Sequence, residues 1–176
     1  MPLFEVHHSF ALTDAQKQSL AEAITAAHVD EFNAPPIFVN VRFIDTRGAP
    51  PNTFYVAGRP AGPGPLPNGI LYHARYSTAR TKERFDRVTA RIEKAWYETV
   101  GKGGGKGHPH LTEDKSVWLH AIGVTPTIAS REAGFNMPTP EGDKAWIEEN
   151  LPEFERLAAG GSEMFKALLE DIPKLK

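Results

Sequence analysis

The chain has 176 residues with 20 basic and 22 acidic side chains, a formal net charge of −2, and no cysteine. A chain of this length suits one domain with a core of its own. The balanced charge argues against a nucleic-acid surface, and the lack of cysteine excludes disulfides, thiolate nucleophiles and thiolate metal sites. No apolar run reaches the ~18 residues of a membrane span, and the first thirty residues do not resemble a secretory signal. We therefore expect a soluble, cytoplasmic protein without membrane or nucleic-acid partners.

The chain starts with Met1 and Pro2, followed directly by an apolar segment, residues 3–9, that we interpret as a strand. Aminopeptidases remove an initiator Met before a small residue, so the mature chain would begin with the secondary amine of Pro2. Such an amine titrates near pH ~8 and can serve as a general base. A Met-Pro start taken alone is more often accidental, but here the strand would tie the terminus into a sheet.

The first half of the chain predicts a strand-helix-strand unit. Thr13 and Gln16 fit a capping box that opens a helix, and Leu20, Ile24 and Ala27 follow at helical spacing up to about residues 28–32. The sequence Ala-Pro-Pro at 34–36 ends this helix. Residues 37–44 then alternate as a strand does, and a short strand is expected at 53–57.

The second half repeats the same order of elements. We expect a strand at 70–76, a helix at 81–100 with Phe85, Val88, Ile92 and Ala95 or Trp96 on its buried face, and a strand at 116–122. Parallel crossovers of this kind place both helices on one face of a sheet. The predicted units are residues 2–57 and 69–123 of a single domain, 1–176. Residues 124–176 form a C-terminal extension with helices at 143–159 and 163–169.

Two other motifs carry no chemistry in our interpretation. The run Gly101–Gly107 invites comparison with a phosphate-binding loop, but it follows a helix and Lys106 is followed by Gly rather than Ser or Thr. His108 and His110, like the pair His7 and His8, lack a carboxylate at ligand spacing. We therefore predict no metal and no cofactor.

Four further residues are candidates for a functional site, although none of them is diagnostic when taken alone. Arg75 and Arg80 flank the junction between the second strand and helix, where they could grip a carboxylate, although two solvated arginines would look the same. His28 lies near the end of the first helix, and Glu132 follows the last strand of the second unit. Each of these two, taken alone, reads as an ordinary structural or solvated side chain.

The order of these features resembles the tautomerase superfamily, whose enzymes combine an N-terminal proline with a β-α-β building block. Residues 12–28 are similar to the first helix of the cis-3-chloroacrylic acid dehalogenase subgroup, and residues 73–92 to its second strand and helix. Residues 39–43, 95–96 and 131–135 are closer still to the "putative oxalocrotonate tautomerase" family. The resemblance spans residues 2 to about 150.

This resemblance implies an α+β fold of two fused β-α-β units around a mostly four-stranded sheet, assembled as a homotrimer. It implies Pro2, His28 and Glu132 as catalytic residues and Arg80 as a substrate-binding residue. We add His120 as a catalytic candidate and Arg75 as a second substrate-binding candidate. The sequence departs from the dehalogenase pattern at two positions. The second substrate arginine of that subgroup aligns with Ser77, and its assisting tyrosine aligns with His120.

Three functions follow from these residues. The first is cofactor-independent tautomerisation of a small 2-oxo or enol acid by Pro2 as a free amine. The second is hydration of an unsaturated three-carbon acid, with dehalogenation or decarboxylation as variants, in which Glu132 activates water and protonated Pro2 delivers a proton to carbon. The third is a non-catalytic binding protein, which retention of Met1 would favour.

Overall fold

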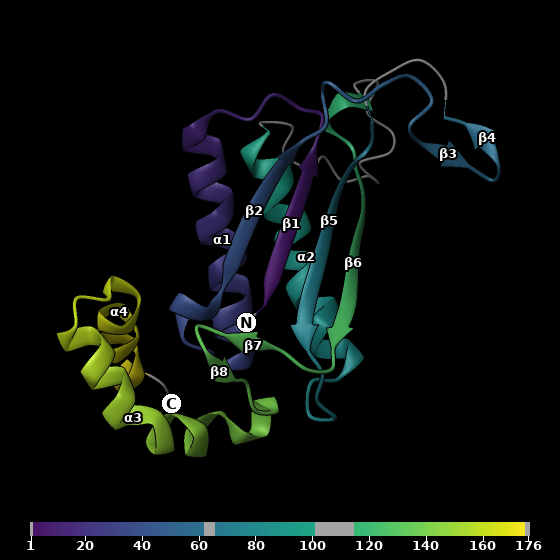
Figure 1. Cartoon of the computed structure of the whole chain (residues 1–176). Coiled ribbons are helices and arrows are strands. Elements are labelled where there is room, and N and C mark those ends of the chain that lie inside the picture. The colour runs from purple at the N-terminus through teal and green to yellow at the C-terminus, as the bar shows by residue number, and fades with distance from the viewer. Residues whose placement is uncertain (1, 62–65, 101–114, 175–176) are drawn as a thin grey trace.

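The computed structural model describes residues 2–61, 66–100 and 115–174, and a four-stranded sheet forms its centre (Figure 1). The strand order is β2-β1-β5-β6, in which β1 pairs with β2 and β5 with β6 in parallel, while β1 and β5 are antiparallel. These strands are β1 (Leu3–His8), β2 (Asn40–Asp45), β5 (Asn68–Arg75) and β6 (Leu119–Thr127). The predicted α+β fold of two fused β-α-β units is confirmed. Gly101–Gly107, His108 and His110 lie outside the described residues.

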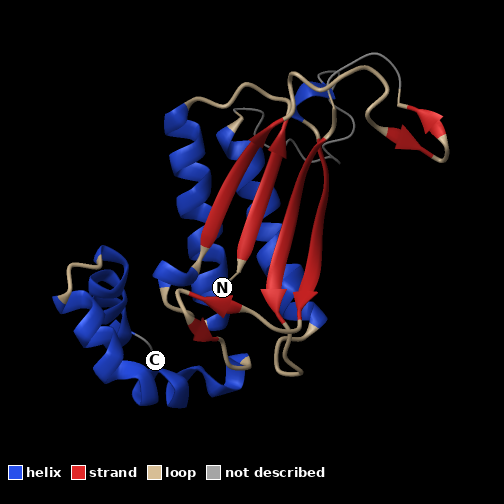
Figure 2. Ribbon diagram, in the orientation of Figure 1, coloured by secondary structure: helices blue, strands red, loops and turns tan. Residues whose placement is uncertain are grey.

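Helices α1 (Asp14–Phe32) and α2 (Lys82–Thr99) cover the same face of the sheet (Figure 2). The predicted capping box of α1 is present, because the Thr13 hydroxyl accepts a hydrogen bond from the Gln16 amide and the Gln16 side chain accepts one from the Thr13 amide. The inward faces were also predicted correctly: Leu20, Ile24 and Ala27 of α1 and Val88, Ile92 and Trp96 of α2 are fully buried. None of the described helices is long and apolar enough to cross a membrane.

Three predicted strands differ in their limits. A 3₁₀ turn, η1 (Pro36–Phe38), takes the start of the expected 37–44 strand, because the fixed φ of proline suits such a turn. A second turn, η3 (Lys115–Val117), precedes β6, which then continues to Thr127 alongside β5. The strand expected at 53–57 is reduced to β3 (Tyr55–Val56), which pairs with β4 (Arg59–Pro60) in a hairpin that projects from the main sheet (Figure 1).

The C-terminal extension, residues 124–176, contains the two predicted helices, but its first part is not helical. It begins with the end of β6 and a small hairpin of β7 (Arg131–Glu132) and β8 (Phe135–Asn136). Ala133 and Gly134, both at positive φ, form the two-residue turn of this hairpin. A short turn, η4 (Pro140–Gly142), leads to α3 (Asp143–Ala159) and α4 (Glu163–Asp171), followed by η5 (Ile172–Lys174).

The C-terminal helices bury a second apolar cluster, separate from the core under the sheet. Its buried members are Phe38, Phe154, Ala158, Phe165 and Leu168, so the turn η1 of the first unit packs against both α3 and α4. The extension is therefore anchored to the main fold close to the start of β2. The predicted limits of α3 are confirmed, and α4 runs two residues beyond the predicted end.

Candidate active site

One end of the sheet gathers most of the predicted site residues. Leu3, the first residue of β1, pairs with Asn40 at the start of β2 and with His73 near the end of β5. The start of β1 therefore lies between the beginning of one strand and the end of another. β7 passes this same end of the sheet (Figure 1), and Glu132 on β7 shares a surface hollow with Leu3 and Asn40. The fold thus brings segments from all parts of the chain to the place where β1 begins.

Pro2 is buried at this end of the sheet. Its carbonyl accepts a hydrogen bond from the Asn40 amide at 3.0 Å, which fixes the first described residue against β2. Continuing the antiparallel register by one residue beyond Leu3 and His73 places Pro2 opposite Ala74. Met1 lies outside the described residues.

His28 and Tyr72 form a buried pair beside the start of β1. The His28 Nδ1 and the Tyr72 hydroxyl are 2.5 Å apart, and both side chains are fully buried. The Tyr72 ring stacks on Phe4, which links the pair to β1. Burial, followed by the positive charges of Arg80 and Arg75, lowers the pKa of His28 to about 3. Burial raises the pKa of Tyr72 above its ordinary value.

Both members of this pair are therefore neutral near pH 7. The Nε2 of His28 is buried and has no hydrogen-bond partner among the described residues. A neutral imidazole whose Nδ1 is fixed by a hydroxyl can offer its Nε2 to a ligand as a hydrogen-bonding group. It is not a source of protons at neutral pH.

The depressed pKa of His28 predicts that stability falls with acidification. Between pH 6.5 and about 3 the unfolded chain binds a proton at this position and the folded chain does not, so the free energy of unfolding decreases as pH falls through this window. The slope from this one group approaches roughly 1.4 kcal/mol per pH unit. Urea unfolding at pH 7 and pH 5, at one protein concentration, measures this change in the free energy of unfolding. His28→Gln should show a flatter pH dependence than wild type, and equal slopes would contradict the assignment.

Arg80 is a buried cation that forms no ion pair with an acidic side chain of the described residues. Its residue is only 8% exposed, and its guanidinium carbon lies 4.6 Å from the centre of the Phe32 ring. No described residue forms a hydrogen bond or an ion pair with this guanidinium. Burial, and next the positive charge of Arg75, lower the pKa of Arg80 below its ordinary value, although an arginine remains charged. Such a group favours an anionic ligand, because a buried charge without a partner is costly.

Arg75 differs from Arg80, because its charge is balanced within the chain. Its two terminal nitrogens donate to the two carboxylate oxygens of Asp143 at 2.6 and 2.7 Å, and one also donates to the Pro138 carbonyl at 2.8 Å. Nearby, the Ser77 hydroxyl donates to the Glu141 carboxylate. The turn after β8 is therefore fastened to the end of β5. The predicted pair of carboxylate-binding arginines contains one that is already occupied.

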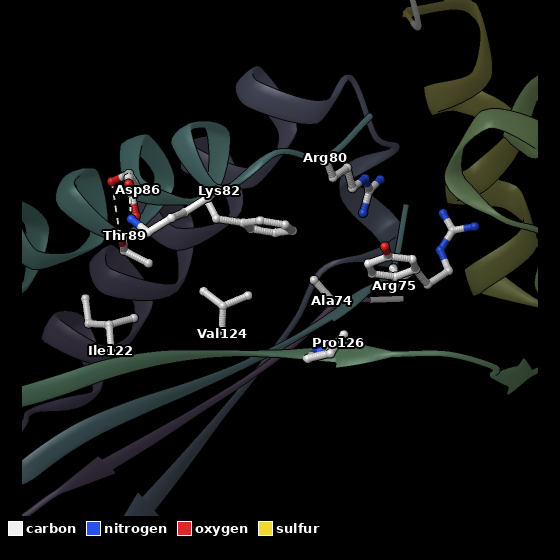
Figure 3. A pocket seen from close by; sticks show the side chains of 11 residues that line it. Ala74, Arg75, Arg80, Lys82, Asp86, Thr89, Ile122, Val124 and Pro126 are labelled. Carbon is white, nitrogen blue, oxygen red and sulfur yellow. Dashed lines mark hydrogen bonds and ion pairs between the residues drawn. The ribbon is translucent and has the colours of Figure 1, made fainter. Parts of the chain in front are cut away.

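Both arginines line a hollow of about 440 Å³ that lies between α2 and β6 (Figure 3). Ala74, Ile122, Val124 and Pro126 contribute apolar surface from the strands, and Phe85 contributes it from α2. Pro2 and His28 do not line this hollow. Ala74, the residue that faces Pro2 in the extended register, does. The hollow combines apolar walls with Arg80, which forms no ion pair with a described residue, and this combination suits a small acid with an apolar part.

His120 is not brought to the other site residues within one chain. It lies exposed near the start of β6, with its ring against Phe54. β5 and β6 are parallel and Arg75 pairs with Thr127, so the arginine end of the sheet corresponds to the end of β6. His120 lies seven residues earlier, roughly 23 Å along the strand. Its predicted role beside His28 is therefore not possible inside a single chain.

Three residues of the site escaped sequence reasoning. Tyr72 could have been found, because strand alternation puts it on the same face as Ile70 and Ala74, toward the helices and His28. Phe32 lies on the same face of the first helix as His28, but nothing in the sequence indicated that its ring contacts an arginine. Asp143 opens α3, and nothing in the sequence indicates its contact with an arginine 68 residues earlier.

Several solved structures share this fold. N1, described as a member of the cis-3-chloroacrylic acid dehalogenase family, is 19% identical over 83% of this chain and 90% of its own, with a TM-score of 0.57. A fused 4-OT, described as an asymmetric trimer, is 15% identical over 76% and 94% with a TM-score of 0.54. Pt0534 inactivated by 2-oxo-3-pentynoate is 17% identical over 76% and 95% with a TM-score of 0.51.

These identities establish the fold and not the reaction. No curated protein matches the chain. The family described as "Putative oxalocrotonate tautomerase enzyme" matches residues 1–151, which include every predicted site residue and Asp143. The chain therefore belongs to this family and, with it, to the tautomerase superfamily.

Proposed function

We propose that this chain is a cofactor-independent tautomerase that acts on a small 2-oxo or enol carboxylic acid. The observation that carries the proposal is Arg80, a buried guanidinium without an anion among the described residues, at the border of an apolar hollow. Membership of a family of tautomerases and dehalogenases supports it. So does the position of Pro2 at the same end of the sheet.

The proposed reaction moves one proton within the substrate. Arg80 binds the carboxylate and stabilises the negative charge that develops on the enolate. The Pro2 nitrogen, as a free amine, removes the proton from the enol oxygen and returns it to carbon, so that no other reactant is consumed. The Nε2 of His28 offers a hydrogen bond to the substrate from the buried side of the site. This mechanism requires that Met1 be removed, since an amide nitrogen at Pro2 has no useful basicity.

A hydratase is the second candidate, and the position of Glu132 favours it. Glu132 lines a hollow together with Leu3, the residue that follows Pro2. In this alternative Glu132 removes a proton from water, the water oxygen bonds to an unsaturated three-carbon acid, and protonated Pro2 gives its proton to the neighbouring carbon. The two mechanisms need opposite protonation states of the same amine. The non-catalytic binding protein remains the third proposal, for a chain that retains Met1.

Glu132→Gln separates the two enzyme mechanisms. A tautomerase does not use water as a reactant, so the variant should ketonise phenylenolpyruvate with a kcat within about tenfold of wild type. A hydratase needs Glu132 to activate water, a contribution of roughly 10²–10⁴-fold. Wild type and variant are assayed on phenylenolpyruvate and on an acetylenic three-carbon acid. We expect wild type to ketonise the enol and the variant to retain most of this rate.

Two outcomes would replace the tautomerase proposal. If wild type converts only the unsaturated acid, or if the variant loses both activities together, the hydratase takes its place. Glu148→Gln, a change of the same chemistry on α3, is the matched control for nonspecific loss. If wild type converts neither acid, the result supports the proposal of a non-catalytic binding protein.

We also propose that the chain assembles as a homotrimer. On the sheet face opposite the helices, Glu5 forms an ion pair with Arg42 and lies 3.7 Å from the His73 ring nitrogen Nε2. Neither helix of the two units covers this face (Figure 2). The fused 4-OT that shares the fold is described as a trimer.

A further inference from the structure

We infer that Asp143 determines substrate charge, by occupying Arg75 and leaving a site that binds one carboxylate and gains no affinity from a second carboxylate on the ligand. The inference deepens the proposed function and rests on its assignment of Arg80 as the carboxylate anchor. It starts from the contrast between two arginines at the same hollow, one paired and one unpaired.

The contact between Asp143 and Arg75 has the geometry of a bound substrate carboxylate. Both carboxylate oxygens face both terminal nitrogens of the guanidinium, at 2.6 and 2.7 Å. This two-point arrangement is the one with which arginine holds carboxylate ligands. Arg75 is 6% exposed and the Asp143 side chain 23% exposed, so the pair is shielded from water. Asp143 therefore takes the place that a second carboxylate of a ligand would need.

Asp143 is held in this position by its neighbours. The Pro138 carbonyl accepts a hydrogen bond from the same guanidinium. Glu141 accepts one from Ser77, two residues beyond Arg75. Three contacts hold this segment against the end of β5, so a ligand carboxylate would have to displace a preorganised and largely buried ion pair.

The charges around the hollow support the same conclusion. Besides Arg80, the basic side chains that line the hollow or stack beside it each have an acidic partner among the described residues. These pairs are Arg75 with Asp143, Lys82 with Asp86, and Arg84 with Glu31. Arg80 alone among these cations forms no ion pair with a described residue, which matches a monocarboxylate whose apolar part contacts Phe85, Ile122 and Val124.

The test compares binding of two four-carbon acids, butyrate and succinate, by NMR titration. In wild type, the Kd of succinate should lie within about threefold of that of butyrate. In Asp143→Asn, which keeps the shape but removes the charge, the Kd of succinate should fall by roughly tenfold or more, because Arg75 becomes available for a charge-assisted hydrogen bond. The Kd of butyrate should stay within about threefold.

Two further variants assign the effect. Glu141→Gln removes a carboxylate from the same segment without freeing Arg75, and it should leave the ratio of the two affinities unchanged. Arg75→Gln added to Asp143→Asn should abolish the gain for succinate. The inference is overturned if Asp143→Asn changes both acids equally, or if the gain persists without Arg75.

If Asp143→Asn fails to fold, binding of the two acids by wild type still tests the inference. A wild-type chain that binds succinate ten times more tightly than butyrate contradicts the inference, and so does one that binds neither acid. Because binding needs no turnover, failure of the two proposals is distinguishable. A chain that binds butyrate with the expected selectivity but does not ketonise phenylenolpyruvate refutes the tautomerase and leaves the role of Asp143 standing.

Discussion

Pro2→Ala should lower kcat for ketonisation of phenylenolpyruvate by roughly two to four orders of magnitude, the usual contribution of a positioned general base. The substitution replaces a secondary amine with a primary amine of different basicity and freedom. It retains the backbone carbonyl that accepts the hydrogen bond from the Asn40 amide, so the urea midpoint should change little. Steady-state kinetics measure the effect, and the intact mass of each protein establishes whether Met1 has been removed.

A chain whose terminus is blocked provides the control. A retained tag before Pro2 converts the amine into an amide, and activity should then be lost completely. The compound 2-oxo-3-pentynoate, used on Pt0534, is an electrophilic acetylenic ketone that a free amine can attack. The mass of the N-terminal peptide should increase by that of one inhibitor molecule in the processed chain, and the mass of this peptide should not change in the tagged chain. Full activity of the tagged, uncleaved protein would exclude Pro2 as the base.

The arrangement of elements was predictable because the signals for it are local. The capping box at Thr13 and the apolar stripe through Leu20 and Ile24 fix the start and the buried face of α1 without reference to the rest of the chain. Two strand-helix-strand units then restrict the sheet, since parallel crossovers have one handedness. The strand limits were less accurate, because pairing with β5 rather than local sequence extends β6 to Thr127.

The shared location of most candidate residues was predictable, but their contacts were not. Pro2, His28, Arg75, Arg80 and Glu132 lie toward one end of the sheet, as the family resemblance implied. The partners that decide what each can do come from distant segments. The Tyr72 hydroxyl lies 44 residues from His28 in sequence, and Asp143 lies 68 residues from Arg75. Hydrogen bonds across such separations depend on tertiary packing, which no local pattern encodes.

For His120, sequence comparison suggested a position in the site that the strand register does not support. Alignment with a family tyrosine suggested a role beside His28, but a strand position assigns a residue to an end of the sheet as well as to a face. The parallel pairing of β5 and β6 places His120 next to the start of β5, near Asn68, and away from Arg75. Sequence similarity alone could not supply this information, because it depends on the register between two strands.

Arg80→Ala should raise KM for phenylenolpyruvate and lower kcat/KM by about 1.5–3 kcal/mol, or roughly 10–150-fold, as expected for loss of a charge-assisted hydrogen bond to the carboxylate. The physical reason is that Arg80 is the cation at the hollow without an acidic partner among the described residues. The methyl ester of the same substrate has no carboxylate charge, so its kcat/KM should fall much less.

Arg84→Ala is the matched control for this prediction. Arg84 stacks on the same Phe32 ring, with its guanidinium carbon 4.8 Å from the ring centre, but it is paired with Glu31 at 3.0 Å. Removing it takes away the same kind of side chain and a similar aromatic contact without removing the uncompensated charge. Its effect on kcat/KM should therefore be small for both acid and ester. Equal losses for acid and ester in Arg80→Ala, or equal losses in the two variants, would mean that the carboxylate binds elsewhere.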